Sequence, residues 1–232
     1  MDIHKPKAAH SWREFLIEIG TIICGILIAL SLEQVVELLR TNEKSQAAEA
    51  AIREELSDQL AFATVVLKLK PSLDERVAEL QSAVVVGDHA KVAKLAVLPA
   101  PFVMRAWSST AWVTAGNEQV VSRLDPARRR LYEKLNRQVA AELDLEWRIK
   151  DAYATLLGAR LAVGGDASVA QQTIAAEHLR SDSDMAALVA RAMLKEGQSL
   201  HLSAAPDVVD AGLGDAAKCT NGSARGLPGY VC

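Results

Sequence analysis

One long apolar run near the N-terminus constrains this 232-residue chain more than any other feature. Residues 15–32 contain a single charged residue, Glu18, and the apolar pattern continues to Leu39. About 20 helical residues, at ~1.5 Å each, cross a hydrocarbon layer of about 30 Å. A helix that is apolar on every side has no face to turn toward water, and nothing later in the chain is suited to surround it. We therefore predict a transmembrane anchor helix over residues 14–39.

The residues that flank this run favour a retained anchor. Trp12 and Arg13 stand at its entrance, where interfacial anchors are typical. A cleaved signal peptide is the alternative, because the chain begins with basic residues and residues 29–31 resemble a small-residue cleavage site. Glu18 interrupts the apolar stretch of such a peptide, and no helix breaker follows the cleavage site before Thr41. We favour the anchor.

The distribution of basic residues predicts the orientation of the span. Lys5, Lys7 and Arg13 precede it, whereas only Arg40 and Lys44 follow it closely. The positive-inside rule then places a short inner tail, residues 1–13, in the cytoplasm. This predicts a single-pass protein of a bacterial inner membrane with its C-terminal domain in the periplasm.

The positions of the cysteines are consistent with an oxidising compartment. Cys24 lies in the apolar run, whereas Cys219 and Cys232 bracket a short tail rich in glycine and proline. A disulfide between these two cysteines fits the periplasm, where disulfides persist. Two free thiols are the alternative, and the sequence leaves both open.

One face of the predicted membrane helix carries small and polar residues. Glu18, Thr21, Gly25 and Ala29 recur at helical spacing, and small residues four apart let helix backbones approach closely. An ionisable group in a membrane usually faces protein or water. The face predicts an interface with a second copy or with another membrane protein. The alternative for Glu18 is that its carboxylate reaches the nearby headgroups.

The remaining chain is predicted to be all-α. Aromatic residues are only 4% of the chain and alanine is abundant, which favours packed helices over sheets. We predict that the membrane helix continues as a rod to Pro71, that a second helix runs from Ser72 to Gly87, and that Asp88 caps a short helix. No heptad pattern longer than three turns stands out.

The second half predicts three more helices and a tail. Asp125-Pro126 is a strong helix start, and Gly164-Gly165 closes that long helix. Two shorter helices are expected over residues 167–179 and 185–200, the second opened by Asp182 or Asp184. The resulting architecture is an antiparallel helical bundle over residues 40–202, followed by a loop-rich C-terminal tail over residues 203–232.

Motifs for catalysis, cofactors or metals are missing from the sequence. The five histidines are scattered, and no phosphate-binding loop or serine elbow occurs. We therefore expect no catalytic residue, no metal and no cofactor. The net charge of −3 provides no basic field for nucleic acid. The triplet of residues 128–130, three consecutive arginines, is expected to be a solvated helix face.

Trp107 and Trp112 stand out in a chain with few aromatic residues. Small and hydroxyl side chains separate the two indoles. We expect both tryptophans to organise the bundle core, and a ligand groove between them is the alternative.

Two blocks of the sequence carry a resemblance. WREFLIEIGTIICGILIALSLEQVVELL and the following AAEAAIREELSDQL resemble a group of uncharacterised single-pass bacterial membrane proteins, and the W-SSTAW and RRRLYEKLN segments are similar to their second block. Glu14, Glu18, Glu33 and Gln34 match the polar positions of the first block. The resemblance implies one N-terminal membrane helix, a helical domain and no assigned activity, so no catalytic residue is carried over.

Together these features predict a non-enzymatic, membrane-anchored helical interaction or scaffold protein, either oligomeric or an accessory subunit of a membrane complex. Its expected partners are the lipid bilayer and, through the membrane helix, itself or another membrane protein. A periplasmic helical-bundle sensor that binds a ligand is the alternative.

Overall fold

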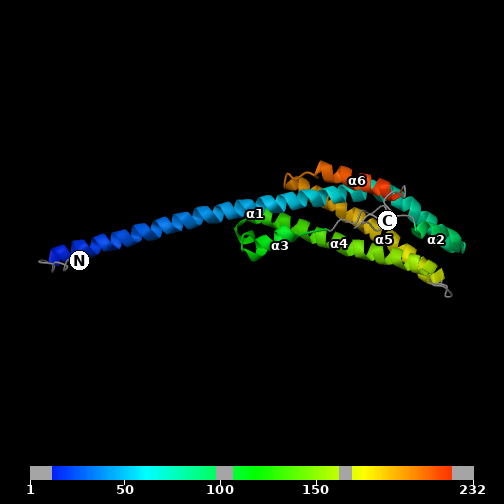
Figure 1. The fold of residues 1–232 in the computed structure, drawn as a ribbon, viewed down its shortest axis with the longest axis horizontal. Coiled ribbons are helices and arrows are strands. Elements are labelled where there is room, and N and C mark those ends of the chain that lie inside the picture. Colours follow the sequence, from blue (N-terminus) through cyan, green and yellow to red (C-terminus); the bar gives the residue numbers. More distant parts are fainter. Residues whose placement is uncertain (1–11, 98–106, 162–168, 221–232) are drawn as a thin grey trace, which may run out of the picture. The chain divides into compact units, whose positions relative to one another are not determined.

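The computed structural model describes residues 12–97, 107–161 and 169–220, and within these ranges the protein is all-α, as predicted. Figure 1 shows the helices in chain order. They are α1 (Trp12–Val85), α2 (His89–Val97), α3 (Thr110–Asn117), the 3-10 turn η1 (Val121–Arg123), α4 (Pro126–Leu161), α5 (Val169–Ser199) and α6 (Pro206–Thr220). The chain divides into two compact units, Met1–Ala47 and Ala48–Cys232.

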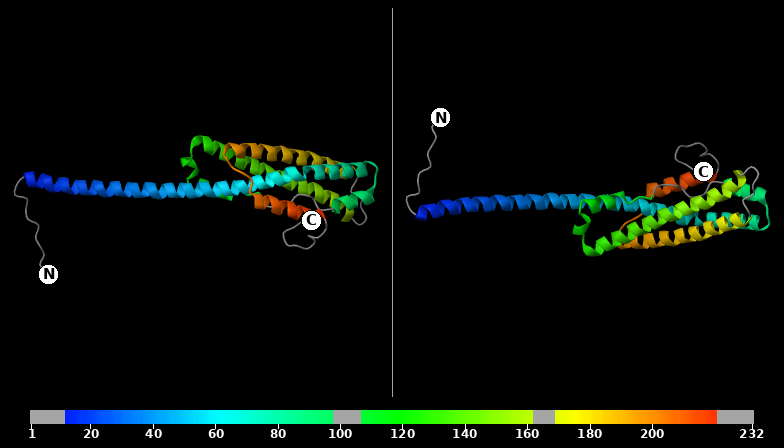
Figure 2. Two further views of the ribbon diagram at one scale, coloured as in Figure 1. Left: turned by 90° about the horizontal axis from the view of Figure 1, so that it is seen from above. Right: turned by 90° about the horizontal axis from the view of Figure 1, so that it is seen from below.

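In the unit Ala48–Cys232, the α1 helix packs against later helices in a bundle, with α4 and α5 beside it (Figure 2). Hydrogen bonds join these three helices in addition to their apolar contacts. The Tyr132 hydroxyl on α4 donates to Glu49 on α1 at 3.0 Å, and the Lys70 ammonium on α1 donates to Asp184 on α5 at 2.6 Å. The large side chains that are fully buried include Ile52, Leu56, Leu60, Leu73, Val77, Leu80, Val84, Tyr132, Leu135, Leu156, Leu179 and Met193.

The buried face of α1 follows a heptad pattern, contrary to the sequence-based expectation. Nine of its buried residues are spaced alternately by three and four positions: Leu56, Gln59, Ala63, Val66, Lys70, Leu73, Val77, Leu80 and Val84. Further residues beside this series are also buried: Ile52, Leu60, Ala61, Val65 and Ala83. The alternating series has the spacing of a coiled-coil seam. The pattern is hard to recognise in the sequence because two of its nine positions, Gln59 and Lys70, are polar.

The predicted break at Pro71 is wrong, since α1 passes through this residue to Val85. A proline inside a helix removes one backbone hydrogen bond and costs about 3 kcal/mol. Pro71 is exposed, whereas its neighbours Lys70 and Leu73 are buried in the bundle. Tertiary packing on the opposite face of the helix offsets the cost of the proline.

The predicted break near residue 182 is also wrong, because α5 is one continuous helix. Asp182 and Asp184 resemble helix caps in the sequence, but both make ion pairs to other helices. Asp182 lies 3.5 Å from Arg148 on α4, and Asp184 lies 2.6 Å from Lys70 on α1. Side chains held by such pairs are not available to cap a new helix.

The predicted loop-rich tail is wrong over the part that forms α6. Pro206 occupies the first helical position, where proline is favoured. Val209 packs with Ala61 and Val65 of α1 in a second apolar cluster. At Gly212 an added Cβ would lie 2.9 Å from the Val65 side chain, so glycine permits the close contact. Pro206 and Gly212, which suggest a loop in the sequence, therefore lie at the start of a helix and on the face that contacts α1.

Two predicted helix ends are confirmed. At the end of α1, Gly87 has a positive φ of 71°, and the Asp88 N–H bonds to the Ala83 carbonyl at 2.9 Å, as in a Schellman motif. The Asp88 carboxylate then accepts the Lys91 N–H at 2.9 Å and caps α2.

The predicted start of α4 is confirmed as well. The Asp125 carboxylate accepts the N–H groups of Ala127 and Arg128, both at 3.0 Å. Replacing Asp125 with alanine removes both acceptors and is expected to lower the free energy of unfolding by about 1 kcal/mol. Chemical denaturation of the two proteins measures the difference, and an Asp125→Asn variant, which retains a capping oxygen, is expected to lose less than half as much.

Candidate functional site

The first candidate site is the N-terminal part of α1, in the unit Met1–Ala47. It is long and apolar enough to cross a membrane, and none of its apolar window is buried. Two other kinds of helix are as long and as apolar: a signal sequence near an N-terminus and the core helix of a soluble protein. A core helix is mostly buried, unlike this segment. At the entrance, Trp12 is 74% exposed, its ring centroid lies 5.6 Å from that of Phe15, and Arg13 is exposed.

The predicted interface residues all lie exposed on this helix. They are Glu18, Thr21, Gly25 and Ala29. The Thr21 hydroxyl donates to the Ile17 carbonyl at 2.8 Å, so its polarity is satisfied within the helix. A Cβ added at Gly25 would meet no atom within 4 Å, which leaves the backbone open to a neighbouring helix.

The second candidate site surrounds the two tryptophans. Trp107 is buried in the core, and its ring meets Phe62 edge-on with centroids 5.8 Å apart. Trp112 is partly buried against the same core, with its ring 6.4 Å from that of Tyr132. Both tryptophans therefore belong to the core, as expected.

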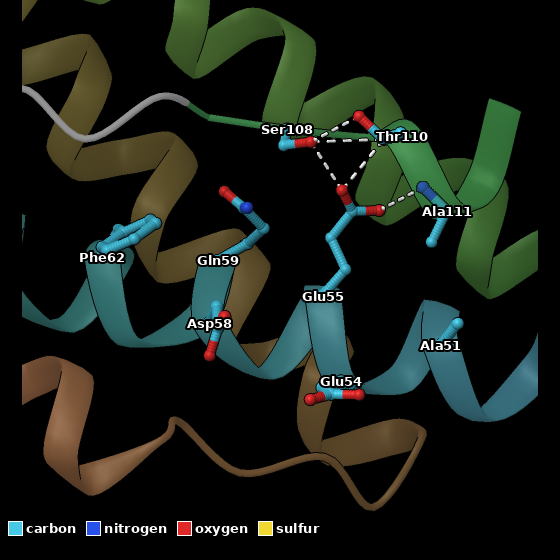
Figure 3. Close-up of a pocket in the computed structure, with 9 residues that line it drawn as sticks. All are labelled: Ala51, Glu54, Glu55, Asp58, Gln59, Phe62, Ser108, Thr110 and Ala111. Carbon is cyan, nitrogen blue, oxygen red and sulfur yellow. Dashed lines mark hydrogen bonds between the residues drawn. The ribbon is translucent and has the colours of Figure 1, made fainter. Parts of the chain in front are cut away.

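A pocket nevertheless lies beside the segment between the two tryptophans (Figure 3). It has a volume of about 610 Å³ and is lined by Ala51, Glu54, Glu55, Asp58, Gln59, Phe62, Ser108, Thr110 and Ala111. Neither tryptophan is among its lining residues. The pocket therefore lies on the surface of α1, beside the segment of residues 108–111, and is not a groove between the two indoles.

Glu55 joins the two sides of this pocket. Figure 3 shows its carboxylate extending from α1 to the start of α3. It accepts the Ser108 hydroxyl at 2.6 Å and the N–H groups of Thr110 and Ala111, both at 2.9 Å. The Ser109 side chain makes no capping bond, so Glu55 caps α3 from a different helix. The pocket wall is consequently held in place by a side chain whose role is structural.

Two buried ionisable side chains, Lys70 and Glu142, lie deeper in the bundle. Lys70 is bonded to Asp74 and to Asp184; burial alone would lower its pKa, but these bonds together raise it above 10.5. Glu142 on α4 is buried, and burial, with the nearby Glu146 carboxylate as a second cause, raises the pKa of Glu142 to about 8. Glu142 is therefore mostly protonated at neutral pH.

The other candidates from the sequence are metal ligands, the arginine triplet and the cysteines. In the described ranges, no three His, Cys, Asp or Glu side chains gather as metal ligands would. The arginine triplet lies at the surface, where Arg128 pairs with Glu49 at 3.3 Å. Cys24 is free and exposed. The predicted bond between Cys219 and Cys232 lies outside what the structure describes, as do most of the inner tail and the side chain of Glu14.

No family model, curated protein or solved structure matches the chain. The resemblance inferred from the sequence therefore identifies no family. Over the described residues the chain is all-helical, with one long apolar helix near the N-terminus.

Sequence reasoning missed the roles of Glu55, Gln59 and Glu142. Glu55 occurs in a run of charged residues on a helix and looks like any solvated carboxylate. Gln59 and Glu142 are each polar residues on otherwise apolar faces. The signal that distinguishes Gln59 and Glu142 is their register among the buried residues, which becomes visible once the packing is known.

Proposed function

We propose that this protein is a non-enzymatic, membrane-anchored helical interaction protein. In this proposal, residues 14–39 cross a bacterial inner membrane once, with the N-terminus in the cytoplasm and the bundle unit in the periplasm. The anchor positions the bundle at the membrane surface, and the face of Glu18, Thr21, Gly25 and Ala29 contacts a second copy or another membrane protein.

One observation supports the anchor above all others. Sixteen large apolar side chains between Trp12 and Leu39 are exposed. Burial of each such side chain is worth about 1.5–3 kcal/mol, so leaving them all in water costs tens of kcal/mol. A lipid bilayer covers such a surface on every side, whereas one partner helix covers only a strip of it.

The interface is tested by substitution at two glycines of the same helix. Gly25 lies on the proposed face, and Gly20, five residues earlier, lies about 140° around the helix. An added Cβ meets nothing within 4 Å at either position, so isoleucine fits both in the single chain. We expect Gly25→Ile to reduce cross-linking between chains, or to a partner, by about fivefold, equivalent to ~1 kcal/mol. Gly20→Ile should leave it unchanged.

The measurement is cross-linking in isolated membranes, followed by extraction in mild detergent and mass spectrometry. Equal cross-linking of wild type and both variants would contradict the interface. A chain that is found in the soluble fraction, or that starts at Leu32, would contradict the anchor itself.

A ligand-binding sensor is the second candidate. The pocket beside residues 108–111 favours it, because the pocket is large enough for a small molecule and Glu55 fixes the start of α3, which forms one of its walls.

A further inference from the structure

The α6 helix packs on α1 through a small apolar cluster of its own. Figure 1 and Figure 2 show α6 lying along α1, on the side away from α4. The buried members of this cluster are Ala61 and Val65 of α1 and Val209 of α6, whereas the main core joins α1 to α4 and α5. Little apolar surface therefore holds α6 in place. Elements with few buried contacts open at a lower free energy than the rest of a domain.

The α6 helix does not have the sequence of a helix that is stable alone. It covers only Pro206–Thr220, and isolated helices of about 15 residues are marginal in water even when they are rich in alanine. Gly212 and Gly214 lower its helix propensity further. Once detached, α6 is therefore expected to pack again on an α1 surface rather than to persist as a free helix.

The contact between α6 and α1 is specific in shape. Val65 fills the space beside Gly212, because a Cβ added at Gly212 would lie 2.9 Å from a methyl group of Val65. A helix that packs here needs a residue without a side chain at this position. Every copy of the chain carries the same α1 surface and the same α6. The α6 helix of one copy therefore fits the α1 helix of another as well as it fits its own.

The connection between α5 and α6 has the properties of a hinge. It consists of residues 200–205 and reverses the direction of the chain, as Figure 2 shows. His201 in this connection has a positive φ of 53°, a left-handed conformation that is costly for residues with a side chain. Straightening the connection would relieve this strain. Short, strained connections favour the exchange of an element between chains.

Hydrogen bonds to α1 oppose the exchange, because they hold the connection in its folded-back form. The Ser57 hydroxyl donates to the Ser203 carbonyl at 2.6 Å, and the Ala205 N–H donates to the Ser57 carbonyl at 3.3 Å. The Arg53 guanidinium donates to the His201 carbonyl at 3.4 Å. The closed form is therefore favoured in a single chain, and the exchanged form depends on the local concentration of chains.

We propose that α6 is an exchangeable arm through which two copies of this protein bind each other. In the exchanged dimer, α6 of each copy leaves its own α1 and packs on Val65 of the other copy, while residues 200–205 straighten. The extended connection reaches about 20 Å, so the two bundle units lie close together. This contact lies within the unit Ala48–Cys232 and is separate from the proposed membrane interface, so either can fail without the other.

The test uses the distance across the contact. Val65 Cβ lies 3.7 Å from the position of a Cβ added at Gly212, which is a separation typical of disulfides. The chain's own cysteines are first replaced by Cys24→Ser, Cys219→Ser and Cys232→Ser. Val65→Cys and Gly212→Cys are then introduced into two separate full-length chains, which carry different affinity tags and are co-expressed. A bond between positions 65 and 212 then joins two different chains.

We expect a covalent heterodimer linked between positions 65 and 212, detected by non-reducing electrophoresis and by mass spectrometry of the linked peptides. Gly214→Cys in place of Gly212→Cys is the matched control, because Gly214 lies on the same helix and an added Cβ there meets nothing within 4 Å. The control should give at least about fivefold less dimer, since it leaves the thiols far from disulfide geometry.

Two substitutions at the hinge should shift the dimer in opposite directions. Ser57→Ala removes a bond of the closed form and should raise the dimer fraction about threefold. Ser181→Ala is its control, because the Ser181 hydroxyl donates to a carbonyl of its own helix, and it should have no effect. His201→Gly relieves the strain of the closed form and should lower the dimer fraction about fivefold.

The proposal is overturned if the two chains are not joined, or if Gly214→Cys gives as much dimer as Gly212→Cys. It is also overturned if the substitutions at Ser57 and His201 leave the dimer fraction unchanged. Val65→Cys and Gly212→Cys in the same chain should form the bond within that chain. Its absence would contradict the contact between α1 and α6 and, with it, the exchange.

Discussion

Replacing Leu60 with alanine is expected to destabilise the bundle unit by about 3 kcal/mol. Leu60 is 1% exposed and lies in the core formed by α1, α4 and α5. Truncation removes buried methyl groups and leaves a cavity, and both effects favour unfolding. Equilibrium unfolding in urea, followed by circular dichroism, measures the change.

A second substitution tests whether the contact behind this value is correct. At Gly197 on α5, an added Cβ would lie 2.5 Å from Leu60 Cδ1, so Gly197→Ala alone should crowd the core and cost about 1–3 kcal/mol. In the Leu60→Ala background the new methyl group enters the space that leucine has left. The double variant should therefore be more stable than the sum of the single effects, by about 1 kcal/mol or more.

The control for this pair is Gly116→Ala on α3, where an added Cβ meets nothing within 4 Å. It should be neutral or slightly stabilising, since alanine favours helix more than glycine does. Additivity of the Leu60 and Gly197 effects within about 0.3 kcal/mol would show that the two residues are not in contact.

Glu142 is expected to make the stability of the bundle depend on pH, and Glu142→Gln to remove that dependence. The pKa of Glu142 is raised from 4.5 to about 8, mainly by burial. Between these values the folded protein holds a proton that the unfolded chain has released, so the contribution of Glu142 to stability is full below about pH 4.5 and is lost as the pH rises toward 8. One such proton changes the free energy of unfolding by ~1.4 kcal/mol per pH unit.

Glutamine is uncharged at every pH and has nearly the same shape. We therefore expect Glu142→Gln to be close to wild type near pH 5 and more stable by a few kcal/mol near pH 9. Thermal or urea unfolding across this range measures both profiles, and the exposed Glu79→Gln serves as the charge-matched control. Parallel profiles for wild type and Glu142→Gln would mean that Glu142 is not protonated in the fold.

The parts of the fold that follow from neighbouring residues were predictable. The helix start at Asp125 and the end of α1 at Gly87 depend on hydrogen bonds between residues a few positions apart. A short stretch of sequence is therefore enough to predict both helix ends. The apolar run of α1 is equally local, since length and composition alone define it.

The candidate pocket was only partly predictable. The segment between Trp107 and Trp112 drew attention because tryptophan is rare in this chain, and the pocket does border that segment. The polar groups that shape it come from α1, more than 45 residues earlier: Glu55 accepts its hydrogen bonds from residues 108–111. No sequence pattern indicates that α1 and residues 108–111 come into contact, because they meet only after folding.

The sequence by itself determined the all-α class, the apolar segment and the local helix caps, because each depends on composition or on residues close together in the chain. Tertiary structure alone decided that α1 continues through Pro71, that α5 is unbroken at Asp182 and that residues 206–220 form a helix against Val65. In each case local signals favoured a break or a loop. Burial and ion pairs between distant residues contribute more free energy than those local preferences, and such contacts exist only once the helices have packed.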